Sequence, residues 1–198
     1  MHTPIDSFVP QFDLRKRHET VAYAPASIVM EVARNFDLES ISLVRWTFWL
    51  RAKLLRALAT LARPTALISN MTELGWGVLA EEPGKYLLAG AFCQPWEGNV
   101  AFQPIPPERF ASFAEPGQVK IVWTLEVESL GPNLTRLATE TRVRATDDAA
   151  RAKFRSYWRM FSPGILMIRR LILRAVRRQA ESSWRATCSL WRGHALLD

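Results

Sequence analysis

The chain has 198 residues, of which 48% are hydrophobic and 23% charged, so it is expected to be one folded domain with a sizeable core rather than a disordered chain. Its formal net charge of +7 leaves three explanations open: solvated basic helix faces, an anionic membrane surface, or nucleic acid. No stretch approaches the ~20 uncharged apolar residues of a membrane-spanning helix, and the first residues lack the pattern of a secretory signal. We therefore expect a cytoplasmic protein, at most peripheral to a membrane.

The N-terminal region is predicted to be an arm, a strand and a short helix. Residues 1–16 contain two prolines that interrupt regular structure, so they are expected to form the arm. Alternating side chains predict a strand at Arg17–Ala24. Pro25 ends this strand and suits the first turn of a helix over Ala26–Asn35.

A helical insertion is predicted next, over Asp37–Leu74. Its main helix, Ile41–Ala62, is amphipathic and carries several basic residues and two tryptophans. This pattern is compatible with a cover over the domain or with a helix lying on a membrane surface. Both alternatives stay open at this point.

Four further strands follow in two hairpins. Trp76–Ala80 and Lys85–Cys93 flank a strong turn signal, and the second of them is apolar on both faces, so it should be central. A proline-rich connection, Gln94–Gly117, leads to Gln118–Ser129, whose strict alternation predicts one buried and one wet face. The last strand is predicted at Leu134–Ala145.

The final element is predicted to be a long helix ending at Gln179. Thr146 can cap it, and its apolar residues recur at spacings of three and four, which draws one stripe down one face. Pro163 interrupts the pattern and predicts a bend. The order of strand, helices, strands and one long helix indicates an α+β fold rather than alternating βαβ units.

Two stretches resemble the START-like, polyketide cyclase-like (SRPBCC, helix-grip) superfamily, in particular uncharacterised bacterial members. They are HETVAYAPASIVMEVA and ATETRVRATDDAARAKFRSYWRMFSPGILMIRR. The resemblance covers roughly Arg17–Ala180 and implies a curved antiparallel sheet wrapped around a long C-terminal helix. Members of known function hold lipids, sterols, polyketides or plant hormones between sheet and helix. Residues 17–180 would form this domain, and the insertion and the tail at 181–198 depart from the simplest version.

The last strand offers two faces for the expected cavity. Thr139 and Thr141 share one face, and Glu140 and Arg142 share the other. If the threonine face points inward, Glu140 and Arg142 form a cross-strand surface ladder. If the charged face points inward, the two residues are a buried pair and a candidate site. The threonine face suits a cavity wall better.

The expected ligand site combines sheet and helix residues. Aromatic side chains of the long helix would face the sheet, as core or as cavity walls, while two threonines and a tyrosine would orient a ligand. No catalytic, cofactor or metal motif is present, so no catalytic residue, cofactor or metal is assigned. The predicted ligand-binding residues are Trp123, Thr139, Thr141, Phe154, Tyr157, Trp158 and Phe161.

Three functions are compatible with the sequence. The first is non-catalytic binding of a hydrophobic small molecule or lipid. The second is a polyketide cyclase or dehydratase-type enzyme that uses the same cavity. The third is a peripheral membrane or regulatory protein that uses its basic helices; no nucleic-acid-binding module is present, so nucleic acid is not expected. The basic cluster that would meet an anionic membrane consists of Arg169, Arg170, Arg174, Arg177 and Arg178.

Overall fold

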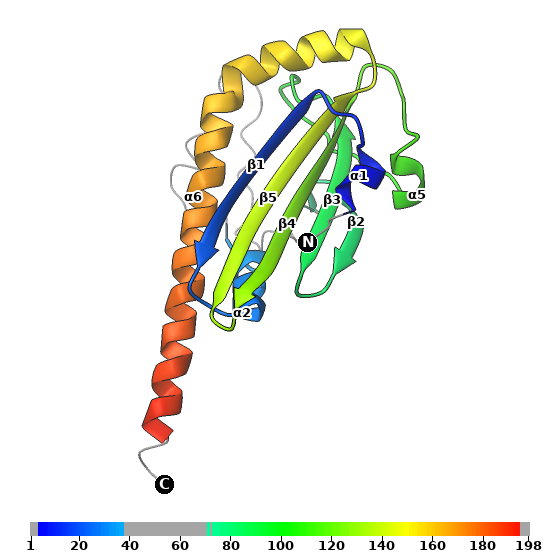
Figure 1. Cartoon of the computed structure of the whole chain (residues 1–198). Coiled ribbons are helices and arrows are strands. Elements are labelled where there is room, and N and C mark those ends of the chain that lie inside the picture. The colour runs from blue at the N-terminus through cyan, green and yellow to red at the C-terminus, as the bar shows by residue number, and fades with distance from the viewer. Residues whose placement is uncertain (1–3, 38–70, 72, 195–198) are drawn as a thin grey trace.

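The computed structural model describes residues 4–37, 71 and 73–194 (Figure 1). The predicted helix Ile41–Ala62 lies outside these described residues, as does most of the predicted insertion around it. In chain order the described elements are α1 (Ile5–Phe8), β1 (Leu14–Ala22), α2 (Ala26–Arg34), β2 (Gly77–Glu82), β3 (Tyr86–Cys93), α5 (Pro107–Phe110), β4 (Val119–Gly131), β5 (Leu134–Ala145) and α6 (Asp148–His194).

The five strands form one antiparallel sheet in the order β1-β5-β4-β3-β2. β1 pairs with β5, so the first and last strands of the chain are neighbours in the sheet. Helix α6 runs along the sheet beside β1 and β5 (Figure 1). The prediction of an α+β fold, with a curved antiparallel sheet wrapped around a long C-terminal helix, is confirmed.

Helix α6 extends from Asp148 to His194, well past the end predicted at Gln179. The tail continues the helix because it contains no proline or glycine before Gly193 that would end it. Pro163 lies inside α6, where it lacks the N–H for one backbone hydrogen bond. The helix bends sharply where its colour changes from yellow to orange, the part that contains Pro163 (Figure 1).

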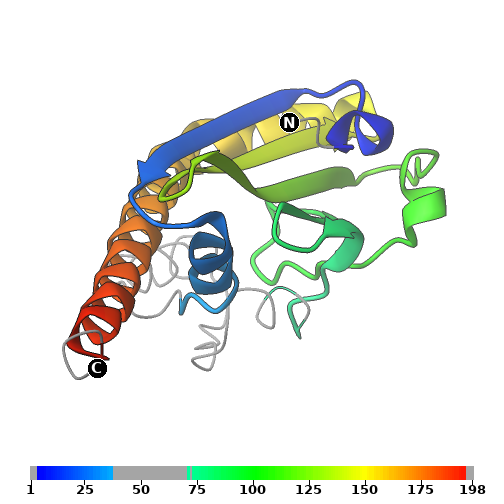
Figure 2. The ribbon, with the colours of Figure 1, turned by 60° about the horizontal axis from the view of Figure 1, so that its bottom comes forward.

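One hydrophobic cluster joins α2, the sheet and the second half of α6. Figure 2 shows α2 beside this part of α6, on the same side of the sheet. Val29 and Met30 of α2 are buried there with Leu137 of β5 and with Leu173 and Val176 of α6. This cluster anchors the C-terminal half of α6 to the sheet.

The other face of the sheet is also covered. The prediction that β4 has one wet face is wrong: Val122, Thr124 and Glu126 on that face are all buried. The short helices α1 and α5 cover this region, where Ile5 and Phe110 pack on Val122. The alternation of β4 correctly separates its two faces, but a strand pattern carries no information about loops that fold over the polar side.

The strand β1 begins at Leu14, three residues earlier than predicted, so the last residues of the expected arm belong to the sheet. Among the described residues of the arm, Ile5–Phe8 form α1. The division into arm, domain and tail stays a prediction.

Candidate ligand-binding site

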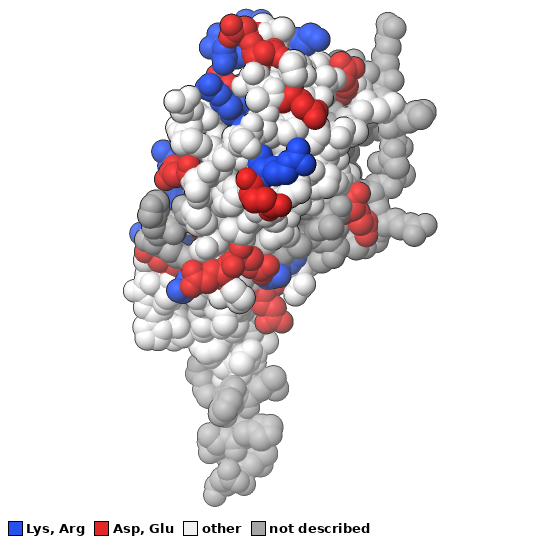
Figure 3. Space-filling model, turned by 90° about the vertical axis from the view of Figure 1, so that its right-hand side faces the viewer, with Lys and Arg blue, Asp and Glu red and all other residues white. Residues whose placement is uncertain are grey.

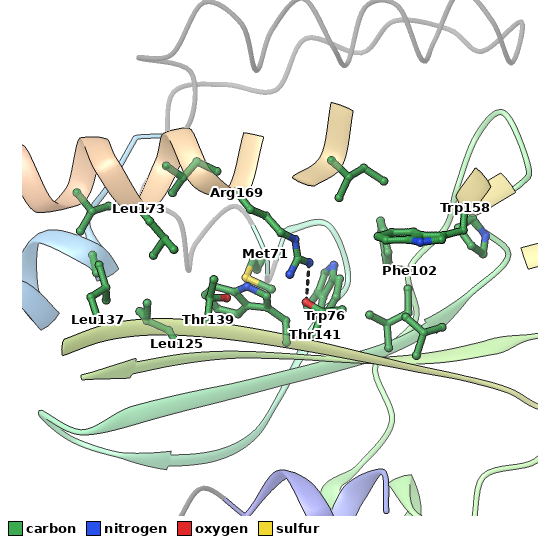
Figure 4. Close-up of a pocket in the computed structure, with 18 of the residues that line it drawn as sticks. Met71, Trp76, Phe102, Leu125, Leu137, Thr139, Thr141, Trp158, Arg169 and Leu173 are labelled. Atoms are coloured by element: carbon green, nitrogen blue, oxygen red, sulfur yellow. Dashed lines mark hydrogen bonds between the residues drawn. The ribbon is translucent and has the colours of Figure 1, made fainter. Parts of the chain in front are cut away.

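A cavity of about 350 Å³ lies between the sheet and α6. Figure 4 shows its side chains converging from the strands on one side and from α6 on the other. A cavity of this size lies at the lower end of the range usual for small-molecule sites.

The sheet wall is formed by alternate residues of β4 and β5. Because successive side chains on a strand point to opposite faces, every second residue reaches the cavity. The register sets Trp123 opposite Thr141 and Leu125 opposite Thr139, which makes these four side chains neighbours. The strand residues that line the cavity are Ile121, Trp123, Leu125, Leu137, Thr139, Thr141 and Val143. The threonine face of β5 is therefore the inner one, as preferred from the sequence.

Helix α6 supplies the opposite wall on both sides of its bend. Aromatic residues come from the part before the bend, where the rings of Phe154 and Trp158 are stacked with centroids 6.1 Å apart. Mainly aliphatic residues come from the part after it. The α6 residues that line the cavity are Phe154, Tyr157, Trp158, Ile165, Arg169, Ile172, Leu173 and Val176.

Six of the seven residues predicted to bind a ligand line this cavity. Phe161 is the exception, because its ring packs on Tyr157 with centroids 4.9 Å apart and does not contribute to the lining. The six lining residues are Trp123, Thr139, Thr141, Phe154, Tyr157 and Trp158. Their role in ligand binding stays a prediction.

The sequence pattern did not indicate the lining residues outside β4, β5 and α6. Trp76 and Phe102 both line the cavity, with their ring centroids 5.2 Å apart. Met71 and Pro95 lie nearby in the lining, and α2 contributes Ala33. Phe102 lies in the proline-rich connection, where an unusual density of aromatic residues was the only available signal.

Arg169 lines the cavity, although the sequence predicts it to belong to the basic cluster of α6. Its side chain points into the cavity and donates a hydrogen bond from Nη2 to Thr141 Oγ1 at 2.5 Å (Figure 4). Its spacing was the missed signal: it lies four residues after Ile165 and four before Leu173, on the apolar stripe. Burial lowers the pKa of Arg169 to about 10.

No carboxylate balances this charge in the part of the chain that the structure describes. None of the ion pairs there includes Arg169, and its Nη1 atom is buried without a hydrogen-bond partner. On the sheet, His18 pairs with Thr139 in the register and interacts electrostatically with Arg169. Its pKa is lowered by burial and by the positive charges of Arg169, Arg170 and Lys16.

The remaining arginines of the cluster differ from Arg169. Arg170, Arg174 and Arg178 are exposed, and Arg177 is half-buried, with its Nε 3.8 Å from Glu181. On the face of the molecule seen in Figure 3, acidic and basic side chains are interspersed rather than separated by sign. None of the described helices is long and apolar enough to cross a membrane.

Glu140 and Arg142 face away from the cavity but are not a surface ladder, so that interpretation is wrong. Their side chains are 3% and 6% exposed, and Arg142 Nε lies 2.7 Å from Glu140 Oε1. Arg142 also pairs with Asp6 at 2.5 Å and donates to the carbonyl of Val9, because α1 folds over this face. Burial alone would raise the pKa of Glu140, but hydrogen bonds from Arg15 and Arg142 outweigh it and hold the pKa below its ordinary value.

The chemistry available to the cavity is limited. Of the described residues that line it, only Tyr157 and Arg169 carry ionisable side chains, and no acid–base pair converges among them. No group of three metal-ligating side chains comes together within residues 4–37, 71 and 73–194. The described walls offer apolar area, the hydroxyls of Thr139, Thr141 and Tyr157, the indole N–H groups of three tryptophans, and one guanidinium group.

Comparisons with known proteins do not add to this description. No family model and no curated protein matches the chain. Among solved structures, the Zhui aromatase/cyclase from Streptomyces sp. R1128 is 15% identical with a TM-score of 0.29, covering 85% of this chain and 93% of its own. Ara h 8.0201 is 8% identical with a TM-score of 0.30, covering 85% and 98%. CalU16 from Micromonospora echinospora is 13% identical with a TM-score of 0.27, covering 87% and 86%. TM-scores of this size carry no argument about family or function.

Proposed function

We propose that this protein binds a hydrophobic small molecule or lipid in the cavity between the sheet and α6. The observation that carries the proposal is the space itself: about 350 Å³ lined, among the described residues, by apolar and aromatic side chains with only a few polar groups. Ligand sites combine an apolar lining with a small number of polar groups that fix orientation. Burial of apolar ligand surface would supply most of the affinity.

The arrangement of the core supports this proposal. One cluster fixes the C-terminal half of α6 through residues such as Leu173. A separate cluster fixes its N-terminal end, where Phe154 packs on Val143. The bend that contains Pro163 lies between them, and the cavity is lined by members of both clusters. A bound apolar molecule would join the two clusters across this gap.

The sequence resemblance to the helix-grip superfamily supports the same function, because its characterised members use the corresponding space for apolar ligands. Assignment of this chain to that superfamily is part of the proposal. The described residues give the two alternative functions less support. A cyclase or dehydratase would require an acid–base pair, and the described lining residues provide none. A membrane-binding surface would lack Arg169, because its side chain lies in the cavity.

Native mass spectrometry of the purified protein tests the proposal. We expect a non-covalent adduct of small-molecule mass, and after its removal we expect an environment-sensitive apolar dye to bind with increased fluorescence. Replacing Ile165, which lines the cavity, by Trp should fill the space and abolish both signals. The matched control is Met167→Trp, because Met167 lies two residues away on the same helix and is 42% exposed.

Two results would count against the proposal. One is the absence of both adduct and dye binding in the parent protein. The other is equal loss of dye binding in Ile165→Trp and Met167→Trp, which would place the dye elsewhere on the molecule.

A further inference from the structure

Arg169 is an unusual residue for the wall of an apolar cavity. It occupies a position on α6 whose neighbours one turn away, Ile165 and Leu173, are both aliphatic. Its guanidinium crosses the space toward β5 and reaches Thr141 (Figure 4). Only one of its two terminal nitrogens has a partner in this part of the structure, since Nη1 is buried without one.

The groups around Arg169 destabilise its positive charge. The charged and titratable groups that face it from β1, His18 and Lys16, are neutral or positive, and Arg170 follows it on α6. Across the cavity β5 offers a hydroxyl, and β4 offers Trp123 and Leu125. Burying a guanidinium without an anion is unfavourable, because no Coulombic attraction offsets the loss of its hydration.

We propose that Arg169 recognises the carboxylate of a hydrophobic organic acid whose apolar part fills the cavity, an inference that rests on the function proposed above. The planar guanidinium can present two parallel N–H donors to a carboxylate. Thr141 fixes one edge of the group, while the unpartnered Nη1 remains available to the ligand. The bound carboxylate would balance the buried charge.

The cavity fits a monoanion better than a phosphate. One guanidinium compensates one negative charge, and the other polar side-chain groups of the described lining, the hydroxyls of two threonines and a tyrosine and the indole N–H groups of three tryptophans, are uncharged. A dianionic phosphate would leave charge uncompensated between apolar walls. Thr139 already donates its hydroxyl to the Thr124 carbonyl at 2.7 Å, which reduces what it can offer an anion.

The test compares decanoate with decanol, which share an apolar chain and differ in charge. Isothermal titration calorimetry at neutral pH, where decanoate is ionised, should show that the parent protein binds decanoate more tightly by about tenfold or more. Arg169→Met should remove this preference by weakening decanoate binding to a similar extent while leaving decanol binding unchanged. Arg169→Lys should retain part of the preference, because it keeps the charge and loses the planar fork.

Arg170→Met is the control, because Arg170 is the next residue on α6 and is exposed. It should leave both affinities unchanged. Circular dichroism checks that each variant is folded, and if Arg169→Met does not fold, Arg169→Lys and the parent protein decide the question.

The outcomes separate this inference from the proposed function. Equal affinity of the parent protein for the two probes, or equal loss of both in Arg169→Met, overturns the role of Arg169 and leaves apolar binding in place. Binding of neither probe to the parent protein overturns both proposals.

Discussion

Two arginines lie on opposite sides of the same strand, each with a guanidinium group that is largely withdrawn from solvent, and they differ in their pairing. Arg142 projects from the outer face of β5 and is surrounded by partners: Glu140 at 2.7 Å, Asp6 at 2.5 Å and the carbonyl of Val9 at 3.1 Å. Arg169 projects from α6 toward the inner face of β5 and bonds to Thr141, the residue before Arg142. It has no carboxylate partner among the described residues. Burial alone would lower the pKa of both; the carboxylates reverse this for Arg142, whereas the pKa of Arg169 falls to about 10.

Arg142 is therefore part of a structural ion-pair network, whereas Arg169 lacks a carboxylate partner among the described residues. The network around Arg142 ties α1 to the sheet, so its charges are satisfied within the fold. Under the carboxylate proposal, the charge of Arg169 lowers the stability of the unliganded protein, and a bound anion compensates it. The same substitution at the two positions should therefore change stability in opposite directions.

The largest effect is expected from Arg142→Met. It leaves Glu140 buried with only Arg15 and Arg17 nearby, and breaking a buried pair costs roughly 3 kcal/mol. Urea denaturation should show this loss in the free energy of unfolding. The control Arg136→Met removes a pair with Glu128 whose side chains are 39% and 36% exposed, and should cost less than about 1 kcal/mol. Equal costs for the two variants would contradict a structural role for the buried network.

A smaller loss is expected when the parent protein is acidified. The folded-state pKa of Glu140 lies below its ordinary 4.5, so the ionised carboxylate stabilises folding above pH 4.5. This contribution is lost as the pH falls through the folded-state pKa. Glu140→Gln cannot titrate, so its stability deficit relative to the parent should narrow in this acidic window. A constant deficit across the window would show that Glu140 does not contribute through its charge.

Arg169→Met should have a modest effect of the opposite sign. Replacing an unpaired buried cation by an apolar side chain should raise the free energy of unfolding of the ligand-free protein by about 1 kcal/mol. Urea denaturation after ligand removal measures it. A loss comparable to that of Arg142→Met would identify Arg169 as a structural residue instead.

The smallest effect concerns the hydrogen bond between Arg169 and Thr141. A double-mutant cycle with Thr141→Val and Arg169→Met should give a coupling energy of about 0.5–1 kcal/mol. The corresponding cycle with Thr139→Val should give almost none, because the hydroxyl of Thr139 bonds to the Thr124 carbonyl. Equal coupling in both cycles would mean that Thr141 does not position the guanidinium.

Much of the fold could be predicted because it follows local periodicity. Alternation located β4 and β5, and the spacing of apolar residues located α6 and the side of it that faces the sheet. The same two periods brought six of the seven predicted site residues to the cavity. The predicted length of α6 was less accurate. The helix continues past Gln179 to His194, because no residue type just after Gln179 forces it to end.

The sequence by itself determined which side chains share a face, because the periods of a strand and a helix are fixed by backbone geometry. It separated Thr141 from Arg142 in this way. Only the tertiary structure decided what covers each face. The folding of α1 over the sheet buried Glu140 and Arg142, and the packing of α6 on β5 turned Arg169 away from its exposed neighbours and into the cavity. Burial and pairing depend on segments far apart in the chain, which local patterns do not record.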